Sequence, residues 1–223
     1  MQMKKQKDLY TESFLKYGST PEAVKWSNKE TQYLRFERLI NQFGNSITGS
    51  LIHDVGSGLC DFHQFLNERK ILHKYSGTEL VDEMIDFSKI RFPDISLYNR
   101  DFMTIDAIEK YDFIVLSGVL NLKLENDDSE GYKNAYKMIK KMFEHSTKAI
   151  SFNMLSTYNT FSQKDLMYFD PTIITDFCIK NLSRFVNVDS SYPLYEFTVT
   201  LFHEEFIAQE YSDNIFAKYL TSH

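Results

Sequence analysis

An acid and two glycines stand at the ends of two apolar segments, in an arrangement that can hold a nucleotide. Residues 51–55 form an apolar segment that runs into Gly56 and Gly58. Glycine lets the backbone approach a ligand closely and adopt conformations that are closed to other residues. A second apolar segment, 74–79, ends in Glu79. A carboxylate at the tip of the second strand of a dinucleotide-type fold accepts hydrogen bonds from ribose hydroxyls, so the two segments predict a ribose-containing ligand.

These residues require a sheet to position them, and the hydrophobic pattern predicts one. Short apolar strands at 51–55, 74–79, 95–98, 111–117 and 148–155 alternate with helical patterns at 61–69, 82–92 and 129–145. Such alternation favours right-handed crossovers and a parallel sheet covered by helices on both faces. After a helix from Asp170 to about Leu182, segments 185–190 and 195–203 flank a turn and predict a hairpin. We therefore expect an α/β fold, a three-layer Rossmann-like sheet that is mostly parallel and has an antiparallel C-terminal hairpin strand.

Helices are predicted on both sides of this region. Thr20-Pro21 is typical of a helix start because proline fits the first turn, and Ser27 to Glu30 match a capping box. Apolar residues at helical spacing follow up to Gly44, where we expect the helix to end, and residues 204–220 form a weakly amphipathic pattern. The chain is thus divided into an N-terminal helical lid (1–44), a central domain (45–204) and a C-terminal helical tail (205–223).

The order of these motifs resembles that of the class I S-adenosylmethionine-dependent methyltransferases, over roughly residues 51–203. Asp54-Val-Gly-Ser-Gly58 is similar to the first motif of that family, with an acid two residues before the first glycine. The resemblance implies S-adenosyl-L-methionine as the cofactor, with Asp54 holding its methionine end through the ammonium group or a bridging water. It also implies that Glu79 binds the ribose and that Met84 packs against the adenine.

Two further motifs continue the resemblance. Asn99-Arg-Asp101-Phe102 is similar to the third-strand motif, whose acid usually accepts a hydrogen bond from the adenine amino group. Segment 111–119 is similar to the fourth strand, whose end, here Ser117, faces the methyl group that is transferred. One position departs from the pattern, because Cys60 stands where the family often has a third glycine. The alternative is a catalytically inactive relative that uses the fold as a scaffold.

The N-terminal segment resembles, more loosely, a bacterial subgroup of small-molecule methyltransferases with an N-terminal helical lid. By this resemblance Tyr17, Gln32 and Arg35 reach the carboxylate of the cofactor or close the pocket, since a guanidinium pairs with a carboxylate through two bonds. The alternative is that Arg35 is a solvated helix residue and Trp26 a core residue.

The acceptor end of the site is predicted from residues at strand ends and in the long segment 156–168, because connections of this size are uncommon unless they are functional. An acceptor that is a poor nucleophile, such as an alcohol, needs a general base, and the candidates for this catalytic role are amide and phenol side chains: Asn121, Asn153, Tyr158, Tyr168 and Tyr192. These groups offer both donors and acceptors to hydroxyl-rich ligands. We expect O-methylation of a sugar, a nucleotide-linked sugar or a phosphate-type precursor of a bacterial surface polysaccharide or natural product. N-methylation of a small amine is the alternative.

Charge and composition narrow the partners. The net charge of −6 argues against the basic face that DNA or large RNA requires, and no apolar run reaches the roughly 20 residues of a membrane span. Ser117 and Asn153 stand where the metal-assisted catechol type has acids, and the histidines lack ligand spacing, so we expect no catalytic metal. The two cysteines, Cys60 and Cys178, lie far apart, which favours a reducing cytoplasm.

Two other functions fit the same residues loosely. A nicotinamide-dependent oxidoreductase would use the two glycines and Glu79, but Asp61 occupies the third glycine position of its fingerprint and the terminal hairpin is foreign to it. A non-catalytic module that binds adenosylmethionine without turnover also stays open, because Asp54, Glu79 and Asp101 would serve binding in either case.

Overall fold

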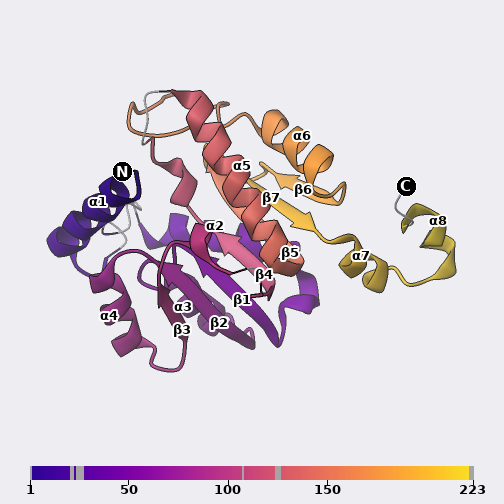
Figure 1. Ribbon diagram of the computed structural model, residues 1–223, viewed down its shortest axis with the longest axis horizontal. Helices are drawn as coiled ribbons and strands as arrows, with labels where there is room; N and C mark the ends of the chain where they lie inside the picture. Colours follow the sequence, from indigo (N-terminus) through magenta and orange to yellow (C-terminus); the bar gives the residue numbers. More distant parts are fainter. Residues whose placement is uncertain (1, 21–22, 24–27, 107, 124–126, 221–223) are drawn as a thin grey trace.

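A seven-stranded sheet forms the centre of the molecule (Figure 1). The computed structural model describes residues 2–20, 23, 28–106, 108–123 and 127–220. The sheet has the order β3-β2-β1-β4-β5-β7-β6, with the bounds β1 Ser50–Val55, β2 His73–Glu79, β3 Ser96–Asn99, β4 Tyr111–Leu116, β5 Ser146–Leu155, β6 Val186–Asp189 and β7 Glu196–Phe202. β1 to β5 pair in parallel, whereas β7 is antiparallel to both β5 and β6. The predicted α/β fold with an antiparallel terminal hairpin is confirmed.

Helices cover both faces of the sheet, as the alternation of strands and helices requires. Successive residues of a strand point to opposite faces, and β4 shows this clearly. Phe113 and Val115 pack with α2 (Lys29–Ile40) and α3 (Asp61–Glu68), while Ile114 and Leu116 pack with α5 (Asp128–His145) and α6 (Pro171–Asn181). Helix α6 places Cys178 in the second of these cores, where its side chain is fully buried.

The N-terminal helices differ in how they pack. Helix α1 (Gln2–Tyr17) lies on α4 (Asp82–Arg91), with the Phe14 and Phe87 ring centroids 6.0 Å apart. Helix α2 enters the core itself, because Phe36 packs on Phe62 with a centroid separation of 5.3 Å and Leu39 is fully buried. Residues 29–40 are therefore part of the packed domain as well as of the predicted lid.

The start of α2 lies one residue later than the sequence predicted. Its N-cap is Asn28, whose Oδ1 accepts a hydrogen bond from the Thr31 amide at 2.8 Å. The predicted cap Ser27, together with Pro21 and Trp26, lies outside the described residues. After α2 the chain continues through the short 3-10 helix η2 (Gly44–Ile47), and Gly44 has a φ of +55°.

The prediction of one continuous helix over 204–220 is wrong, because the structure divides this segment into three short elements. The structure has α7 (Glu204–Glu210), the 3-10 turn η5 (Asn214–Phe216) and α8 (Ala217–Leu220), and α8 lies apart from the sheet in Figure 1. The break has a local cause, because the Asp213 carboxylate accepts from the Ile215 amide and starts a new turn. Phe206 is the buried residue of α7, and η5 and α8 have none.

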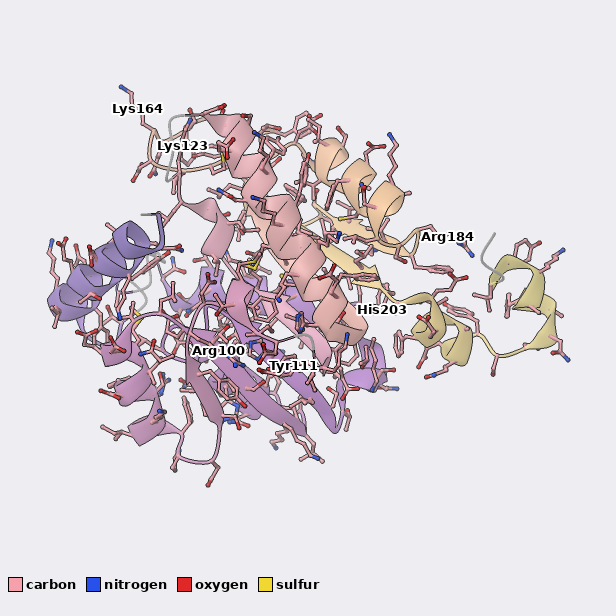
Figure 2. The ribbon with its side chains drawn as sticks, in the orientation of Figure 1. Arg100, Tyr111, Lys123, Lys164, Arg184 and His203 are labelled. Carbon is pink, nitrogen blue, oxygen red and sulfur yellow. The ribbon has the colours of Figure 1, made fainter. Side chains whose placement is uncertain are left out.

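An ion pair and a hydrogen bond to Glu109 fix the amino end of β4. Tyr111, the first residue of β4, donates a hydrogen bond to Glu109 Oε2 at 2.9 Å, and Arg100 donates to Glu109 Oε1 at 2.8 Å. Figure 2 shows Arg100 and Tyr111 on the same part of the molecule, apart from Lys123 and Lys164. Across the part of the chain that the structure describes, every helix is too short or too polar to span a bilayer.

Candidate functional site

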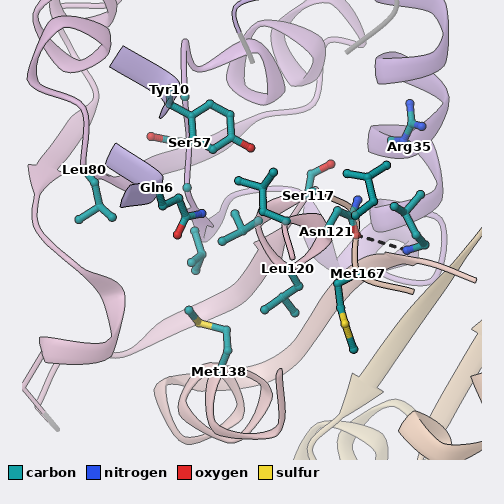
Figure 3. Close-up of a pocket in the computed structure, with 18 of the residues that line it drawn as sticks. Gln6, Tyr10, Arg35, Ser57, Leu80, Ser117, Leu120, Asn121, Met138 and Met167 are labelled. Atoms are coloured by element: carbon teal, nitrogen blue, oxygen red, sulfur yellow. Dashed lines mark hydrogen bonds between the residues drawn. The ribbon is translucent and has the colours of Figure 1, made fainter. Parts of the chain in front are cut away.

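A cavity of about 880 Å³ lies at the carboxyl ends of the parallel strands. Its wall includes the turns that follow β1, β2 and β4, the end of β5 and the first residue of β7. In an open α/β sheet this edge is where ligands bind, because the strand ends leave a crevice there. Helices α1 and α2 contribute further wall residues, among them Gln6, Tyr10 and Arg35 (Figure 3).

The turn after β1 depends on glycine for two reasons. Gly56 and Gly58 have φ values of +71° and +53°, which other residues adopt only with strain. A Cβ on Gly56 would also lie 2.4 Å from Val119 Cγ2, which belongs to the 3-10 helix η4 (Val119–Asn121). The Gly56 and Ser57 amides donate to the Thr78 carbonyl at 2.9 and 3.0 Å, so this turn is tied to the end of β2.

Cys60, which departs from the family pattern, keeps the conformation of a glycine. Its φ of 59° and ψ of 32° are left-handed, at a cost on the order of 1 kcal/mol for a residue with a Cβ. The side chain is fully buried and does not belong to the cavity wall. Burial raises the pKa of the Cys60 thiol to about 12. The thiol therefore leaves the glycine turn open to a ligand.

Asp54 lies in the cavity wall as a buried carboxyl group. Its Oδ2 accepts a hydrogen bond from the Tyr75 hydroxyl at 2.7 Å. Burial raises the pKa of Asp54 to about 7, and the Tyr75 hydrogen bond opposes this rise. A buried acid of this kind gains strongly from a nearby cation, because the low dielectric strengthens the attraction.

Glu79 reaches the cavity from the end of β2 and is already bonded to backbone amides. Its carboxylate accepts from Gly58 at 2.9 Å, from Leu80 at 2.8 Å and from Val81 at 3.0 Å. Burial raises the pKa of Glu79, while these amides act in the opposite direction. The predicted ribose acid thus also holds the glycine turn in place, a second role that sequence reasoning missed.

The residues predicted to surround the adenine are brought together in the same half of the cavity. Met84 is buried and packs with Val81 and Leu59. Asp101 caps the 3-10 helix η3 (Phe102–Thr104) by accepting from the Met103 amide at 3.0 Å. Phe102 is buried beside it, and both line the cavity.

The turn after β4 is held by a buried amide. Asn153 Oδ1 accepts from the Gly118 amide at 3.1 Å, and its Nδ2 donates to Ser117 Oγ at 3.3 Å. Ser117 lines the cavity, but Asn153 is fully buried behind it. The Asn153 amide, a candidate for the catalytic role, is thus used to position the turn and lies outside the cavity wall.

Only some of the other candidates for the catalytic role reach the cavity. Asn121 and Tyr168 line it; Asn121 Oδ1 accepts from the Leu155 amide at 3.3 Å, and the Tyr168 hydroxyl accepts from the Gln163 amide at 3.0 Å. Tyr158 is 67% exposed and lies outside the wall. Tyr192 is buried against β7, where its hydroxyl lies 2.9 Å from Thr198 Oγ1. Tyr158 and Tyr192 therefore do not line the cavity, in contrast to the expectation from the sequence.

Of the three predicted lid residues, Gln32 and Arg35 line the cavity and Tyr17 does not. Arg35 lines the cavity, but its Nε donates to both carboxylate oxygens of Glu196, at 2.9 and 2.8 Å, so its carboxylate partner belongs to the protein. Gln32 lines the cavity and donates to Asp61 Oδ2 at 3.2 Å. Tyr17 is 41% exposed and lies outside the wall, where Tyr10 stands instead.

A curated relative decides the family. No family model matches the chain. Over 151 residues the chain is 30% identical to a Mycobacterium tuberculosis protein provisionally named methyltransferase Rv1506c, covering 66% of this chain and 90% of the relative. The chain belongs to the methyltransferase family. This assignment decides between the methyltransferase and the oxidoreductase that the glycine turn left open, and it confirms the resemblance in the sequence.

Solved methyltransferase structures share the fold of this chain. Magnesium protoporphyrin IX methyltransferase of Synechocystis PCC 6803, solved with bound S-adenosylhomocysteine, matches with a TM-score of 0.65 at 11% identity, over 91% of this chain and all of that one. The N-methyltransferase NodS of Bradyrhizobium japonicum WM9, also solved with S-adenosylhomocysteine, matches with a TM-score of 0.62 at 14% identity, over 88% and 99% of the two chains.

The residues of the β1/β2/β3 half fit an adenosyl cofactor chemically. Two carboxyl groups, Asp54 and Glu79, suit an ammonium group and ribose hydroxyls, and Met84 and Phe102 offer apolar surface to a base. The Ser57 hydroxyl adds an unused polar group, because it is buried in the wall and makes no hydrogen bond with any described residue. Such an unpaired group is costly unless a ligand or water satisfies it.

Sequence reasoning missed several residues in and around the cavity wall of the methyltransferase, namely Tyr10, Ser57 and Glu196 in the wall and Tyr75 behind it. Tyr10 and Phe14 stand four residues apart in α1, a helical spacing that signals one packed face. Glu196 is an acid at the start of an apolar strand, and buried acids are usually paired. Ser57 and Tyr75 carry no such signal, because their importance arises from the strand register.

Proposed function

We propose that the enzyme transfers the methyl group of S-adenosyl-L-methionine to a hydroxyl group of a small molecule in the cytoplasm. The acceptor is a sugar, a nucleotide-linked sugar or a phosphate-type precursor of a bacterial surface polysaccharide or natural product. The observation that carries this proposal is one continuous cavity with the adenosyl-type residues at the ends of β1 to β3 and a second part at the ends of β4 and β5. Its volume of about 880 Å³ is near the upper limit of the ~300–1,000 Å³ typical of small-molecule pockets, which suits two adjacent ligands.

The chain's residues hold and orient the reactants. Asp54 would bind the ammonium group, Glu79 and Ser57 the hydroxyl groups, and Met84 and Phe102 the base. When bound, the cofactor supplies an electrophilic methyl group on its sulfonium. Helices α1 and α2 line the cavity and would shield the two reactants from water. Alignment of the two reactants can lower the barrier by about 7–11 kcal/mol, which is the main contribution that such a site makes.

The polar residues of the second part support an acceptor with hydroxyl or phosphate groups. Asn121 and Tyr168 can donate and accept hydrogen bonds there. Lys137, exposed at the rim, is the one described cation of the wall that forms no ion pair with a described residue; Lys7, Arg35, Arg100 and Lys123 each have an acidic partner. A free ammonium group favours a phosphate-bearing acceptor over a small amine, which remains the second candidate.

The test has two parts. First, S-adenosylmethionine and S-adenosylhomocysteine should raise the melting temperature, because a ligand of the native state stabilises it, whereas NAD(H) should not. Second, release of S-adenosylhomocysteine is followed with sugar nucleotides, sugar phosphates, small amines, transfer RNA and protein extract. Turnover confined to the macromolecules would refute the small-molecule acceptor, and turnover confined to amines would refute the oxygen acceptor.

A further inference from the structure

One wall of the cavity is apolar in the part that the adenosyl-type residues leave unused. It is formed by six leucine and methionine side chains from four segments: Leu120, Leu122, Met138, Leu155, Leu166 and Met167. Figure 3 shows Leu120, Met138 and Met167 on one side of the cavity, across from Gln6 and Tyr10. We call these six residues the apolar wall.

The apolar wall is built into the fold through backbone contacts. The Met167 amide donates to the Asn121 carbonyl at 2.9 Å, and the Lys123 amide donates to the Asp165 carbonyl at 2.9 Å. Leu122 and Leu166 form an isolated antiparallel bridge between the same two segments. Met167 also lies directly over Gly131 of α5, where an added Cβ would come within 2.7 Å of its Sδ. The surface is therefore formed before any acceptor arrives.

Its position separates this wall from the base-binding residues. Met84, Asp101 and Phe102 follow β2 and β3, at one end of the strand order. Leu120 and Leu122 follow β4, Leu155 ends β5, and Leu166 and Met167 lie in the connection to α6, on the other side of β1. An adenosyl ligand on the first group leaves the apolar wall to the acceptor.

A hydroxyl-rich acceptor alone would be a poor match for this surface. Apolar side chains offer no hydrogen-bond partner, so a sugar placed against them would lose bonds to water without replacement. An alkyl or aryl group would instead bury apolar area, which is favourable in proportion to the area removed from water.

On the basis of the proposed function, we infer that the acceptor carries an alkyl or aryl group beside the hydroxyl that is methylated. The apolar group lies on the apolar wall, and the polar part of the acceptor lies toward Asn121, Tyr168 and Lys137. The wall is thus the specificity-determining surface of the acceptor site.

The inference is tested by calorimetry with matched probes in the presence of saturating S-adenosylhomocysteine. n-Octyl-β-D-glucoside, below its micellar concentration, and methyl-β-D-glucoside differ only in their alkyl chains. The octyl compound should bind at least about 10-fold more tightly, since each buried methylene group contributes to affinity. Equal binding, or no binding of either probe, would overturn the inference.

Two variants place the probe on the wall. Leu120→Gln and Met138→Gln should each weaken octyl glucoside binding severalfold and leave S-adenosylhomocysteine affinity unchanged. Leu72→Gln is the matched control, because Leu72 is 73% exposed and outside the cavity. Unchanged octyl glucoside binding in both wall variants would also overturn the inference. Failure of S-adenosylhomocysteine to bind would instead refute the proposed function, and the preference between the two glucosides can still be measured without it.

Discussion

Removal of the Tyr75 hydroxyl should shift the pH dependence of cofactor binding. Tyr75→Phe deletes the hydrogen bond of 2.7 Å to Asp54 and leaves the ring in place. Burial raises the pKa of Tyr75 well above its usual value, so its phenol stays a donor across the neutral range. Only ionised Asp54 attracts an ammonium group. With its pKa raised from 3.8 to about 7, affinity for S-adenosylhomocysteine should fall as the pH drops below about 7.

The magnitude follows from the contact. A hydrogen bond to a charged group contributes about 1.5–3 kcal/mol, and about 1.36 kcal/mol corresponds to one pKa unit. Tyr75→Phe should therefore raise the pKa of Asp54 by a further ~1–2 units and lower cofactor affinity at pH 7 by about 5- to 50-fold. The sign is opposite for folding. The stability that Asp54 contributes through its raised pKa is present below about pH 4 and is lost as the pH rises through about 7.

Calorimetric titration with S-adenosylhomocysteine between pH 6 and pH 9.5 measures the shift. Tyr111→Phe is the matched control, because Tyr111 is equally buried, at 6% exposure, and neither it nor its partner Glu109 lines the cavity or contacts Asp54. The control should keep the wild-type midpoint. A flat wild-type profile, or the same midpoint in both variants, would refute the role given to Asp54.

Three further predictions concern the frame around the cavity. Glu79→Ala should weaken S-adenosylhomocysteine binding by about 10-fold or more in calorimetry and lower the melting temperature, because three amides lose their acceptor; a folded variant with unchanged affinity would move the ribose site elsewhere. Arg35→Leu should lower the free energy of unfolding, measured in urea, by about 3–5 kcal/mol because it leaves Glu196 unpaired. The double variant Arg35→Leu, Glu196→Leu should recover much of this loss. An equal loss in the single and the double variant would contradict the pairing. Deletion of residues 2–18 should weaken cofactor binding by about 10-fold through loss of Tyr10 and should keep the fold. Deletion of residues 1–44 should instead unfold the protein, because it removes the core residues Phe36 and Leu39. Full cofactor affinity in the shorter deletion would limit the role of α1 to packing.

The fold could be predicted from the sequence because its signals are local and periodic. The strands that end at Val55 and Glu79, and the hairpin before His203, are short apolar runs with turn residues on both sides. The glycine turn could be predicted as well, since Gly56 and Gly58 have conformations that favour glycine. The tail beyond Glu210 could not, because one capping acid, Asp213, interrupts a weak helical pattern.

The partners inside the site depend on contacts that no local pattern carries. Asp54 meets Tyr75 because β1 and β2 pair with Asp54 opposite Gly77, two residues from Tyr75. Arg35 meets Glu196 across 161 positions of sequence. The sequence shows the charge of each residue, but its partner can be identified only once the order of the strands is known. For the same reason the sequence shows that Asn153 stands at a strand end but does not show that its amide binds Gly118 and Ser117.

Because both cysteines are buried, the native protein should react only slowly with thiol reagents. Burial raises the pKa of both Cys60 and Cys178 to about 12, and the thiolate is the reactive form, so a reagent can act only after a local opening. The two thiols lie in different neighbourhoods, one at the start of α3 behind the glycine turn and the other in α6. The rates at which a thiol reagent modifies Cys60 and Cys178 should therefore report the local opening of these two regions separately, with no cysteine introduced by mutation. A cofactor bound at the glycine turn should slow the modification of Cys60 more than that of Cys178.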